Sequence, residues 1–176
     1  MEKNKVVFLD RDGTINVDYG YVYKTEDLSF IPGALDGLKK LCSAGYKLII
    51  ITNQSGIGRK YFSINDYNKF NEFFLNKLFI NGIKIASVYY CPHIEEDNCD
   101  CRKPKLGLFK KAIREFNVDL DNSIAIGDKE RDLCICESTN IKGILIGDNS
   151  NKYFSCNNLN DAADYILRGE DRWKYL

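Results

Sequence analysis

The chain contains 176 residues, of which 44% are hydrophobic and 28% are charged, and this composition is that of a folded globular protein. Twenty-five basic residues balance twenty-five acidic ones, so charge gives no reason to expect nucleic acid or a membrane surface as a partner. The N-terminus lacks a signal-peptide pattern, and no apolar run approaches the roughly 20 residues of a membrane span, which favours a cytoplasmic protein.

The first predicted strand is Val6–Leu9, four apolar residues that are followed at 10–14 by Asp-Arg-Asp-Gly-Thr. An unbroken apolar run is typical of a buried parallel strand, and open α/β sheets hold their chemistry at the carboxyl ends of such strands. Asp10 and Asp12 need a cation or hydrogen-bond donors at that position. Taken alone, an ordinary Asp-Gly turn explains the pair equally well.

The remaining chain alternates between strand and helix patterns. In chain order, the patterns predict a loop over 15–22, a helix over 34–41, a strand over 46–52, a helix over 64–79, a strand over 83–90, a helix over 106–116, a strand over 123–128, a helix over 130–138, a strand over 143–146 and a helix over 159–167. This alternation predicts an α/β fold in one domain, 1–176, with a parallel sheet between two helical layers.

Polar side chains close three of the predicted strands. Asp10 and Asp12 follow the first strand, Thr52 and Asn53 end the second, and Asp128 ends the strand over 123–128. Parallel strands end at one edge of a sheet, so these side chains are expected to meet. Carboxylates gathered in one place repel each other unless a cation lies between them, and Mg²⁺ prefers oxygen ligands. The sequence therefore predicts a Mg²⁺ site, although each piece alone is common in structural turns.

The same edge is suited to phosphate chemistry. Lys103 and Lys129 are cationic candidates there, and the second strand end adds hydroxyl and amide donors. Asp10, at the strand end, could act as a carboxylate nucleophile. Asp12 could act as general acid and then as general base.

Seven cysteines, an odd number without an export signal, argue against a disulfide framework. Cys42, Cys134, Cys136 and Cys156 are interpreted as small core or surface residues. The other three lie within eleven residues together with the one histidine of the chain. The four side chains are Cys91, His93, Cys99 and Cys101.

This Cys₃His set suits a structural Zn²⁺ of tetrahedral geometry, because four protein ligands leave no position for a catalytic water. A loop with free thiols is the alternative. A zinc loop over about 91–103 would hold Arg102 and Lys103 beside the phosphate site, whereas a solvated basic pair is the plainer interpretation of these two residues.

Residues 10–14, the Thr52 strand end, a downstream lysine and Gly127-Asp128 resemble the ordered motifs of the haloacid dehalogenase superfamily of phosphatases. The resemblance implies a Rossmann-like three-layer sheet and an aspartyl-phosphate on the nucleophile Asp10. It implies that Asp12 is the acid/base and that Thr52 and Lys103 stabilise the phosphoryl group.

The same resemblance implies that Mg²⁺ binds to Asp10, the backbone carbonyl of Asp12, and Asp128. Asp132 completes a Gly-Asp-x₃-Asp pattern one helical turn further on, where it could stand behind the metal ligands.

Cys-Pro-His at 91–93 and Cys-x-Cys-Arg-Lys-Pro at 99–104, with 16–22, 52–57 and 127–129, are more specific. They resemble the family of D-glycero-D-manno-heptose 1,7-bisphosphate 7-phosphatases from about Val6 to Ile146. The resemblance implies removal of the C7 phosphate in nucleotide-activated heptose biosynthesis, and it implies no large cap domain. The family's substrate contacts would fall on Asp18, Tyr19, Gly20, Tyr21, Asn53, Gln54, Ser55, Arg102 and Lys129.

One departure leaves the substrate open. Five residues separate His93 from Cys99, a spacing that resembles the zinc loop of the related histidinol-phosphate phosphatases. A histidinol-phosphate phosphatase is therefore the first alternative, and a non-catalytic, zinc-stabilised binding module is a rival of another class. We expect a monomer that acts on a small-molecule sugar phosphate.

Overall fold

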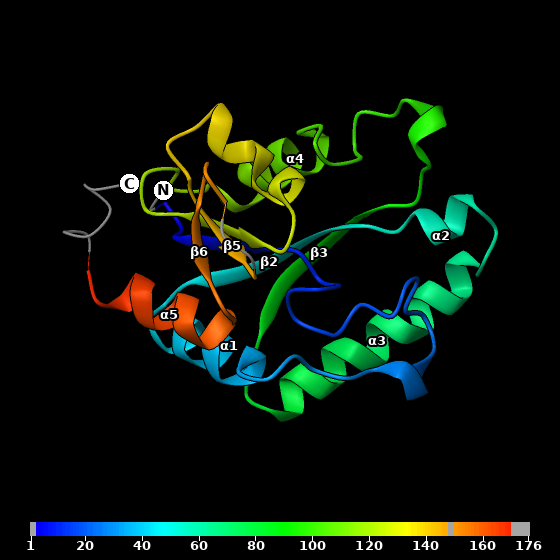
Figure 1. Ribbon diagram of the computed structural model, residues 1–176, viewed down its shortest axis with the longest axis horizontal. Helices are drawn as coiled ribbons and strands as arrows, with labels where there is room; N and C mark the ends of the chain where they lie inside the picture. The colour runs from blue at the N-terminus through cyan, green and yellow to red at the C-terminus, as the bar shows by residue number, and fades with distance from the viewer. Residues whose placement is uncertain (1–2, 148–149, 170–176) are drawn as a thin grey trace.

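A parallel sheet forms the centre of the computed structural model, which describes residues 3–147 and 150–169 (Figure 1). Within these ranges six strands lie in the order β3-β2-β1-β4-β5-β6, and every neighbouring pair is parallel. The strands are β1 (Val6–Leu9), β2 (Lys47–Asn53), β3 (Ile85–Cys91), β4 (Ile124–Gly127), β5 (Lys142–Ile146) and β6 (Phe154–Cys156). The sheet order places β1 between β2 and β4, so the three polar strand ends of the sequence are adjacent.

Helices cover both faces of the sheet (Figure 1). One face carries α1 (Ala34–Ser43), α3 (Ile64–Ile80) and α5 (Leu159–Leu167), and the other carries α4 (Gly107–Phe116) and the 3₁₀ helix η3 (Glu130–Glu137). The short elements are η1 (Thr25–Asp27), α2 (Ser55–Gly58) and η2 (Glu95–Asp97). Since the longer helices of the described residues pack on this sheet, no large cap domain is present among them.

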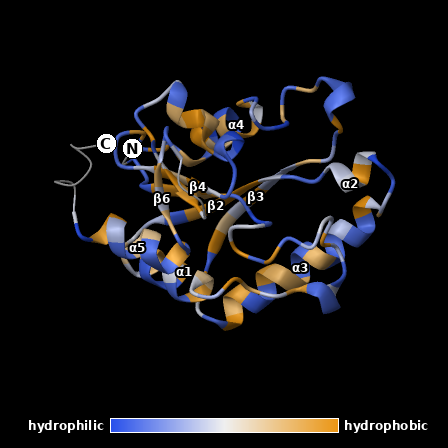
Figure 2. Ribbon diagram, in the orientation of Figure 1, coloured by the Kyte–Doolittle hydropathy of each residue, from blue (hydrophilic) through white to orange (hydrophobic). Residues whose placement is uncertain are grey.

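The core explains why the strand sequences are apolar without alternation. Along β1, Val7 and Leu9 face the cluster under α1, α3 and α5, while Val6 and Phe8 face the cluster under α4. All four side chains are at most 1% exposed. In Figure 2 the strands and the inward faces of the helices are accordingly hydrophobic. The three-layer α/β fold predicted from the sequence is confirmed.

The N-terminus of α3 is set by hydrogen bonds between Ser63 and Asp66. The Ser63 hydroxyl accepts a hydrogen bond from the backbone N–H of Asp66 at 3.1 Å, and the Asp66 carboxylate accepts one from the backbone N–H of Ser63 at 2.9 Å. This reciprocal capping box satisfies two donors that a helix start leaves open. Ser63 is thus the N-cap of α3, and the helix predicted over 64–79 is present as Ile64–Ile80.

Five elements differ from the sequence prediction. The predicted helix over 130–138 is a 3₁₀ helix, because the Asp132 N–H bonds to the Lys129 carbonyl at 2.9 Å while its carboxylate accepts from the Lys129 N–H at 3.0 Å. Those two contacts close a tighter turn than an α-helix. The short elements α2, β6, η1 and η2 were not predicted, since none of them is long enough to show a periodic pattern.

None of the helices in the described ranges is long and apolar enough to span a membrane. All seven cysteines are free thiols. The C-terminal tail with Trp173 lies outside the described residues.

Candidate active site

A cavity of about 290 Å³ opens at the carboxyl ends of β1, β2 and β4. The predicted catalytic and magnesium-binding residues all line it: Asp10, Asp12, Thr52, Lys103 and Asp128. Every predicted substrate contact except Tyr19 lines it too, whereas the Tyr19 side chain is 65% exposed and outside the lining. The structure thus brings together in one cavity residues that are more than a hundred positions apart in the chain.

Three carboxylates crowd the inner end of this cavity. One carboxylate oxygen from each of Asp10, Asp128 and Asp132 lies within 4.8 Å of the others. Burial raises the pKa of Asp10 to about 7, and the Lys103 ammonium opposes that shift only in part. Burial also raises the pKa of Asp128, and the negative charge of Asp132 adds to the effect. This close set of oxygen donors fits a hard cation such as Mg²⁺.

Lys103 is the buried cation of the site. Its Nζ lies 2.8 Å from Oδ1 of Asp10 and 2.7 Å from Oδ1 of Asp132, and it donates to the carbonyl of Ile51 at 2.6 Å. Burial opposes the charge of this ammonium, but the two carboxylates outweigh burial and raise the pKa of Lys103. The Asn53 side chain fixes the Lys103 backbone, because its Nδ2 donates to the Lys103 carbonyl and its Oδ1 accepts from the Lys103 N–H, each at 3.1 Å.

Asp12 is held by a different set of partners. Its Oδ1 accepts from Arg11 Nε at 3.1 Å and Asn16 Nδ2 at 2.9 Å, and its Oδ2 accepts from Arg11 Nη2 and Gln54 Nε2, each at 2.8 Å. The Gln54 amide also donates to Thr52 Oγ1 at 2.9 Å. Asp12 is therefore separate from the three-carboxylate group, and the buried Gln54 joins the ends of β1 and β2.

Gly13 leaves room for the Asp128 carboxylate. A Cβ on Gly13 would lie 2.5 Å from Oδ2 of Asp128, closer than real Cβ contacts allow. The backbone of Gly13 also has a φ of +83°, a conformation that side chains disfavour. The glycine of the Asp-x-Asp-Gly motif thus serves both the turn and the close approach of the Asp128 carboxylate.

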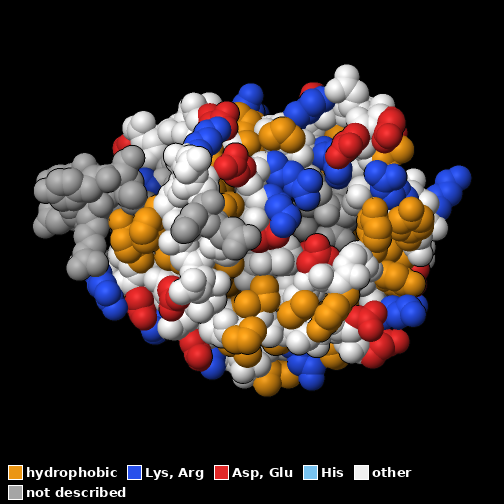
Figure 3. Space-filling view, in the orientation of Figure 1, with side chains coloured by type: hydrophobic (Ala, Val, Ile, Leu, Met, Phe, Trp, Pro, Cys, Tyr) orange, Lys and Arg blue, Asp and Glu red, His pale blue; other side chains and the backbone are white. Residues whose placement is uncertain are grey.

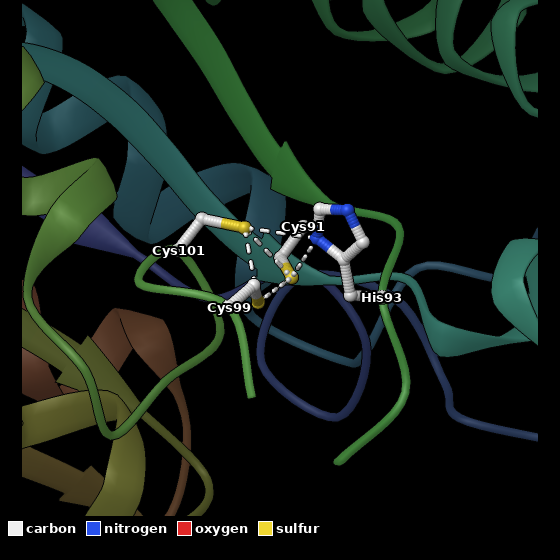
Figure 4. A group of neighbouring side chains, drawn as sticks. All are labelled: Cys91, His93, Cys99 and Cys101. Carbon is white, nitrogen blue, oxygen red and sulfur yellow. Dashed lines mark hydrogen bonds between the residues drawn. The ribbon is translucent and has the colours of Figure 1, made fainter. Parts of the chain in front are cut away.

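The cysteine cluster lies just outside this cavity, with its four side chains pointing toward one another (Figure 4). Cys101 Sγ is 3.1 Å from Cys91 Sγ and 3.3 Å from Cys99 Sγ, and His93 Nδ1 is 3.2 Å from Cys101 Sγ. Tetrahedral Zn²⁺ with bonds of about 2.3 Å would set the sulfurs about 3.8 Å apart, so small shifts would accommodate it. The cluster is therefore suited to Zn²⁺.

The cysteine loop is joined to the residue after β2 and is also braced by contacts within the loop. The backbone N–H of Gln54 donates to the Cys91 carbonyl at 2.7 Å. Arg102 donates to the His93 carbonyl at 3.4 Å and pairs with Glu95 at 3.1 Å. The loop that carries the cluster also carries a wall of the cavity.

Comparison with known proteins identifies the family. A family model described as polynucleotide kinase 3 phosphatase matches residues 5–164. A D-glycero-beta-D-manno-heptose-1,7-bisphosphate 7-phosphatase of Helicobacter pylori is 40% identical over 169 residues, 93% of this chain and 97% of the relative. A D-glycero-alpha-D-manno-heptose-1,7-bisphosphate 7-phosphatase of Campylobacter jejuni is 46% identical over 131 residues, 74% of this chain and 75% of the relative. The chain belongs to the heptose 1,7-bisphosphate 7-phosphatase family.

A solved structure agrees with this assignment. The D,D-heptose 1,7-bisphosphate phosphatase of B. bronchiseptica, complexed with magnesium and phosphate, superposes with a TM-score of 0.85 at 28% identity and covers 93% of this chain and 98% of that one. The family resemblance stated from the sequence is confirmed. The present chain is therefore a phosphoric monoester hydrolase of the haloacid dehalogenase type.

Three arginines at or beside the site were not predicted from the sequence: Arg59, Arg131 and Arg11. Arg59 and Arg131 line the cavity and make no ion pair with another described residue, whereas Arg102 pairs with Glu95 and Lys129 with Asp128. In Figure 3, Lys and Arg side chains gather around the hollow of this face. The third, Arg11, stands between the two motif aspartates and has no exposed surface. Its place in the motif was visible in the sequence, but its burial was not.

Proposed function

We propose that the enzyme removes the C7 phosphate of a D-glycero-D-manno-heptose 1,7-bisphosphate through a phosphoryl group carried on Asp10. The observation that carries the proposal is the Asp10 carboxylate at the end of β1, paired with the buried Lys103 inside a cavity lined by acidic and basic groups. Family membership supports the same reaction class.

In the first step, a carboxylate oxygen of Asp10 attacks phosphorus and the bond from phosphorus to the sugar oxygen breaks. Asp12 gives its proton to that sugar oxygen, which leaves as an alcohol. Lys103, with the Thr52 hydroxyl, stabilises the negative charge on the transferring phosphoryl oxygens.

In the second step, a water molecule attacks phosphorus while the bond from phosphorus to Asp10 breaks. Asp12, now a carboxylate, takes a proton from this water and is restored as the acid. Inorganic phosphate leaves, and Asp10 is free for the next turnover.

The residues present fit a magnesium ion. Asp10 and Asp128 would hold it with the backbone carbonyl of Asp12, as the family resemblance implied, and Asp132 lies close enough to join or orient this group. When bound, Mg²⁺ would neutralise charge on the phosphoryl oxygens. The crowding of buried carboxylates supports such a cation, because without one they repel each other.

We assign the Cys₃His cluster to a structural Zn²⁺. Four protein ligands fill a tetrahedral site, so the ion would organise the loop and take no part in the reaction. The Arg102 contacts to His93 and Glu95 support a role for this loop in shaping the cavity.

The charge of the cavity mouth supports a bisphosphate substrate. Arg59 and Arg131 carry cations that no described carboxylate neutralises, and a second phosphate would pair with such groups. Histidinol phosphate, the main alternative, has an amino cation that these arginines would repel. The relatives are named for both anomers of the heptose, so the anomer is left to experiment.

The test is a comparison of kcat/KM for the two heptose bisphosphate anomers and histidinol phosphate with Mg²⁺ present. ³¹P NMR then shows which phosphate is released. We expect a heptose bisphosphate to be preferred and its C7 phosphate to be lost. Preference for histidinol phosphate would reassign the substrate, and failure to hydrolyse any of the three would favour the non-catalytic binding module.

The biological setting is part of the same proposal. The product would enter nucleotide-activated heptose biosynthesis for surface polysaccharide. The cytoplasmic location, the monomeric state and the single-domain boundary 1–176 stay predictions from the sequence.

A further inference from the structure

Arg11 is a fully buried arginine directly beside the proposed acid/base. It is 0% exposed and is the largest completely buried side chain of the described residues. Its Nε and Nη2 donate two parallel hydrogen bonds to the two oxygens of the Asp12 carboxylate, with N···O distances of 3.1 and 2.8 Å. This bidentate pair is called the fork below. The reaction proposed above gives Arg11 no role.

The same guanidinium joins three segments of the site. Besides Asp12 after β1, Nη2 contacts the carbonyl of Val22 in the loop after that motif at 3.0 Å. It also contacts Oε1 of Gln54 after β2 at 3.3 Å, and Gln54 donates in turn to Asp12 Oδ2. Arg11, Gln54 and Asp12 therefore form a closed triangle, in which each residue bonds to the other two.

The pocket around the Arg11 guanidinium is partly apolar, so packing alone does not explain why an arginine is buried there. Its guanidinium carbon lies 4.8 Å from the ring centroid of Phe70 and 5.9 Å from that of Tyr67, on the inner face of α3. Nη1 is buried without a hydrogen-bond partner. A leucine or methionine would fill this apolar pocket without the desolvation of a cation. What an apolar residue could not supply is the fork on Asp12.

The fork fixes how the Asp12 carboxylate can turn. Each of its oxygens accepts one bond from Arg11 and one from a neutral amide, of Asn16 or Gln54. The ionised carboxylate has about four lone-pair positions, and these four donors occupy them. In the acid form the proton takes the place of one of the two amide bonds, while the two bonds from Arg11 can remain. Two parallel bonds from a rigid planar group set the carboxylate plane, whereas a single point charge would leave it free to rotate.

We propose that Arg11, supported by Gln54, is a positioning residue that holds the Asp12 carboxylate in the orientation from which it transfers a proton to the leaving oxygen. The proposal rests on the proposed function, in which Asp12 is the general acid. It reassigns Gln54, which the family resemblance placed among substrate contacts, to the support of Asp12.

Leaving-group chemistry provides a readout that a merely structural role would not give. An alkyl oxygen, as in a sugar phosphate, needs a proton to leave, whereas p-nitrophenolate leaves without one. The ratio kcat/KM covers only the steps up to formation of the phosphoryl-enzyme. A misplaced Asp12 should therefore lower kcat/KM for the sugar phosphate much more than for p-nitrophenyl phosphate.

The variants are Arg11→Met, Arg11→Lys and Gln54→Met, assayed with Mg²⁺ on a heptose 1,7-bisphosphate and on p-nitrophenyl phosphate. Misplacement of a catalytic group by about 1 Å can lower a rate by about 10²-fold. We expect a loss of that order on the sugar phosphate for Arg11→Met, a smaller but selective loss for Gln54→Met, and a change within about threefold on p-nitrophenyl phosphate. Arg11→Lys keeps the charge but not the fork, so it should stay selectively impaired.

Asp12→Asn is the reference, because it removes the acid itself. Equal losses on both substrates in Arg11→Met, or full activity of Arg11→Lys, would overturn the positioning role. A selective loss in Asp12→Asn would still leave the proposed mechanism standing in that case. An unselective Asp12→Asn would overturn both. If Arg11→Met does not fold, Gln54→Met decides the question alone, and an unselective Gln54→Met then overturns the proposal.

Discussion

The ammonium of Lys103 lies 2.8 Å from Oδ1 of Asp10, although the two residues are 93 positions apart in the chain. The same ammonium lies 2.7 Å from Oδ1 of Asp132, so one buried cation serves two buried carboxylates. A carboxylate after β1, a carboxylate in η3 and an ammonium at the end of the cysteine loop thus share a single electrostatic unit. Loss of Lys103 would therefore leave two buried carboxylates without a cation, whereas loss of either carboxylate would leave the ammonium paired with the other.

Lys103→Met keeps the length of the side chain but leaves both carboxylates without their cation. Breaking a buried ion pair costs about 3–5 kcal/mol, so we expect the free energy of unfolding in urea to fall by about 3 kcal/mol and phosphatase activity to be lost. Lys105→Met is the matched control, because Lys105 is exposed and its ammonium donates only to Asn98 among the hydrogen bonds described. Equal stability of the two variants would contradict the buried ion-pair unit.

Asp10→Asn replaces the proposed nucleophile by a neutral group of the same shape. We expect phosphate release to fall by about 10⁴-fold or more, as for other enzymes that lose their nucleophile, with an unchanged circular dichroism spectrum. The exposed Asp36→Asn serves as the control for an aspartate lost elsewhere on the molecule. Phosphate release by Asp10→Asn at the normal rate would rule out the phosphoryl-enzyme mechanism.

The strand ends explain why so much of this site was predictable from the sequence. Asp10, Thr52 and Asp128 each follow an apolar run, and runs of that kind become neighbouring parallel strands in only a few ways. The cysteine cluster was equally visible, because its four side chains lie within eleven residues. Local patterns sufficed where each functional group is tied to the end of a regular element.

The rest depends on contacts between segments far apart in the sequence. Arg11 lies in a polar turn motif, where nothing local shows that the chain will bury it against α3. The Asp132 contact with Lys103 and the place of Arg131 at the cavity mouth need the packing of η3 beside the cysteine loop. A three-residue edge strand such as β6 has too few residues to carry a pattern.

Removing zinc tests the cysteine cluster. We expect elemental analysis to find about one Zn²⁺ per chain, and a strong chelator to lower the melting temperature by about 10 °C or more, because metal-binding free energy becomes folding free energy. Cys99→Ser should do the same and reduce activity, since the loop carries Arg102 and Lys103. Cys42→Ser is the control, a half-buried thiol outside the cluster. Purified protein that is free of zinc, yet folded and active, would refute the assignment.

Gly13→Ala tests the contact between the first motif and the Asp128 carboxylate. The new methyl group would lie 2.5 Å from Oδ2 of Asp128, so the carboxylate must move away from the metal-binding group. We expect the Mg²⁺ concentration for half-maximal activity to rise by about tenfold or more, since a ligand is displaced.

Gly82→Ala is the matched control for Gly13→Ala. Gly82 has a similar φ, +77° against +83°, but a Cβ there would meet nothing within 4 Å. Both variants should lose about 1–2 kcal/mol of stability from the left-handed backbone conformation. Only Gly13→Ala should change the response to Mg²⁺, because only its methyl group reaches a carboxylate. The same Mg²⁺ dependence in both variants would show that Asp128 does not hold the ion.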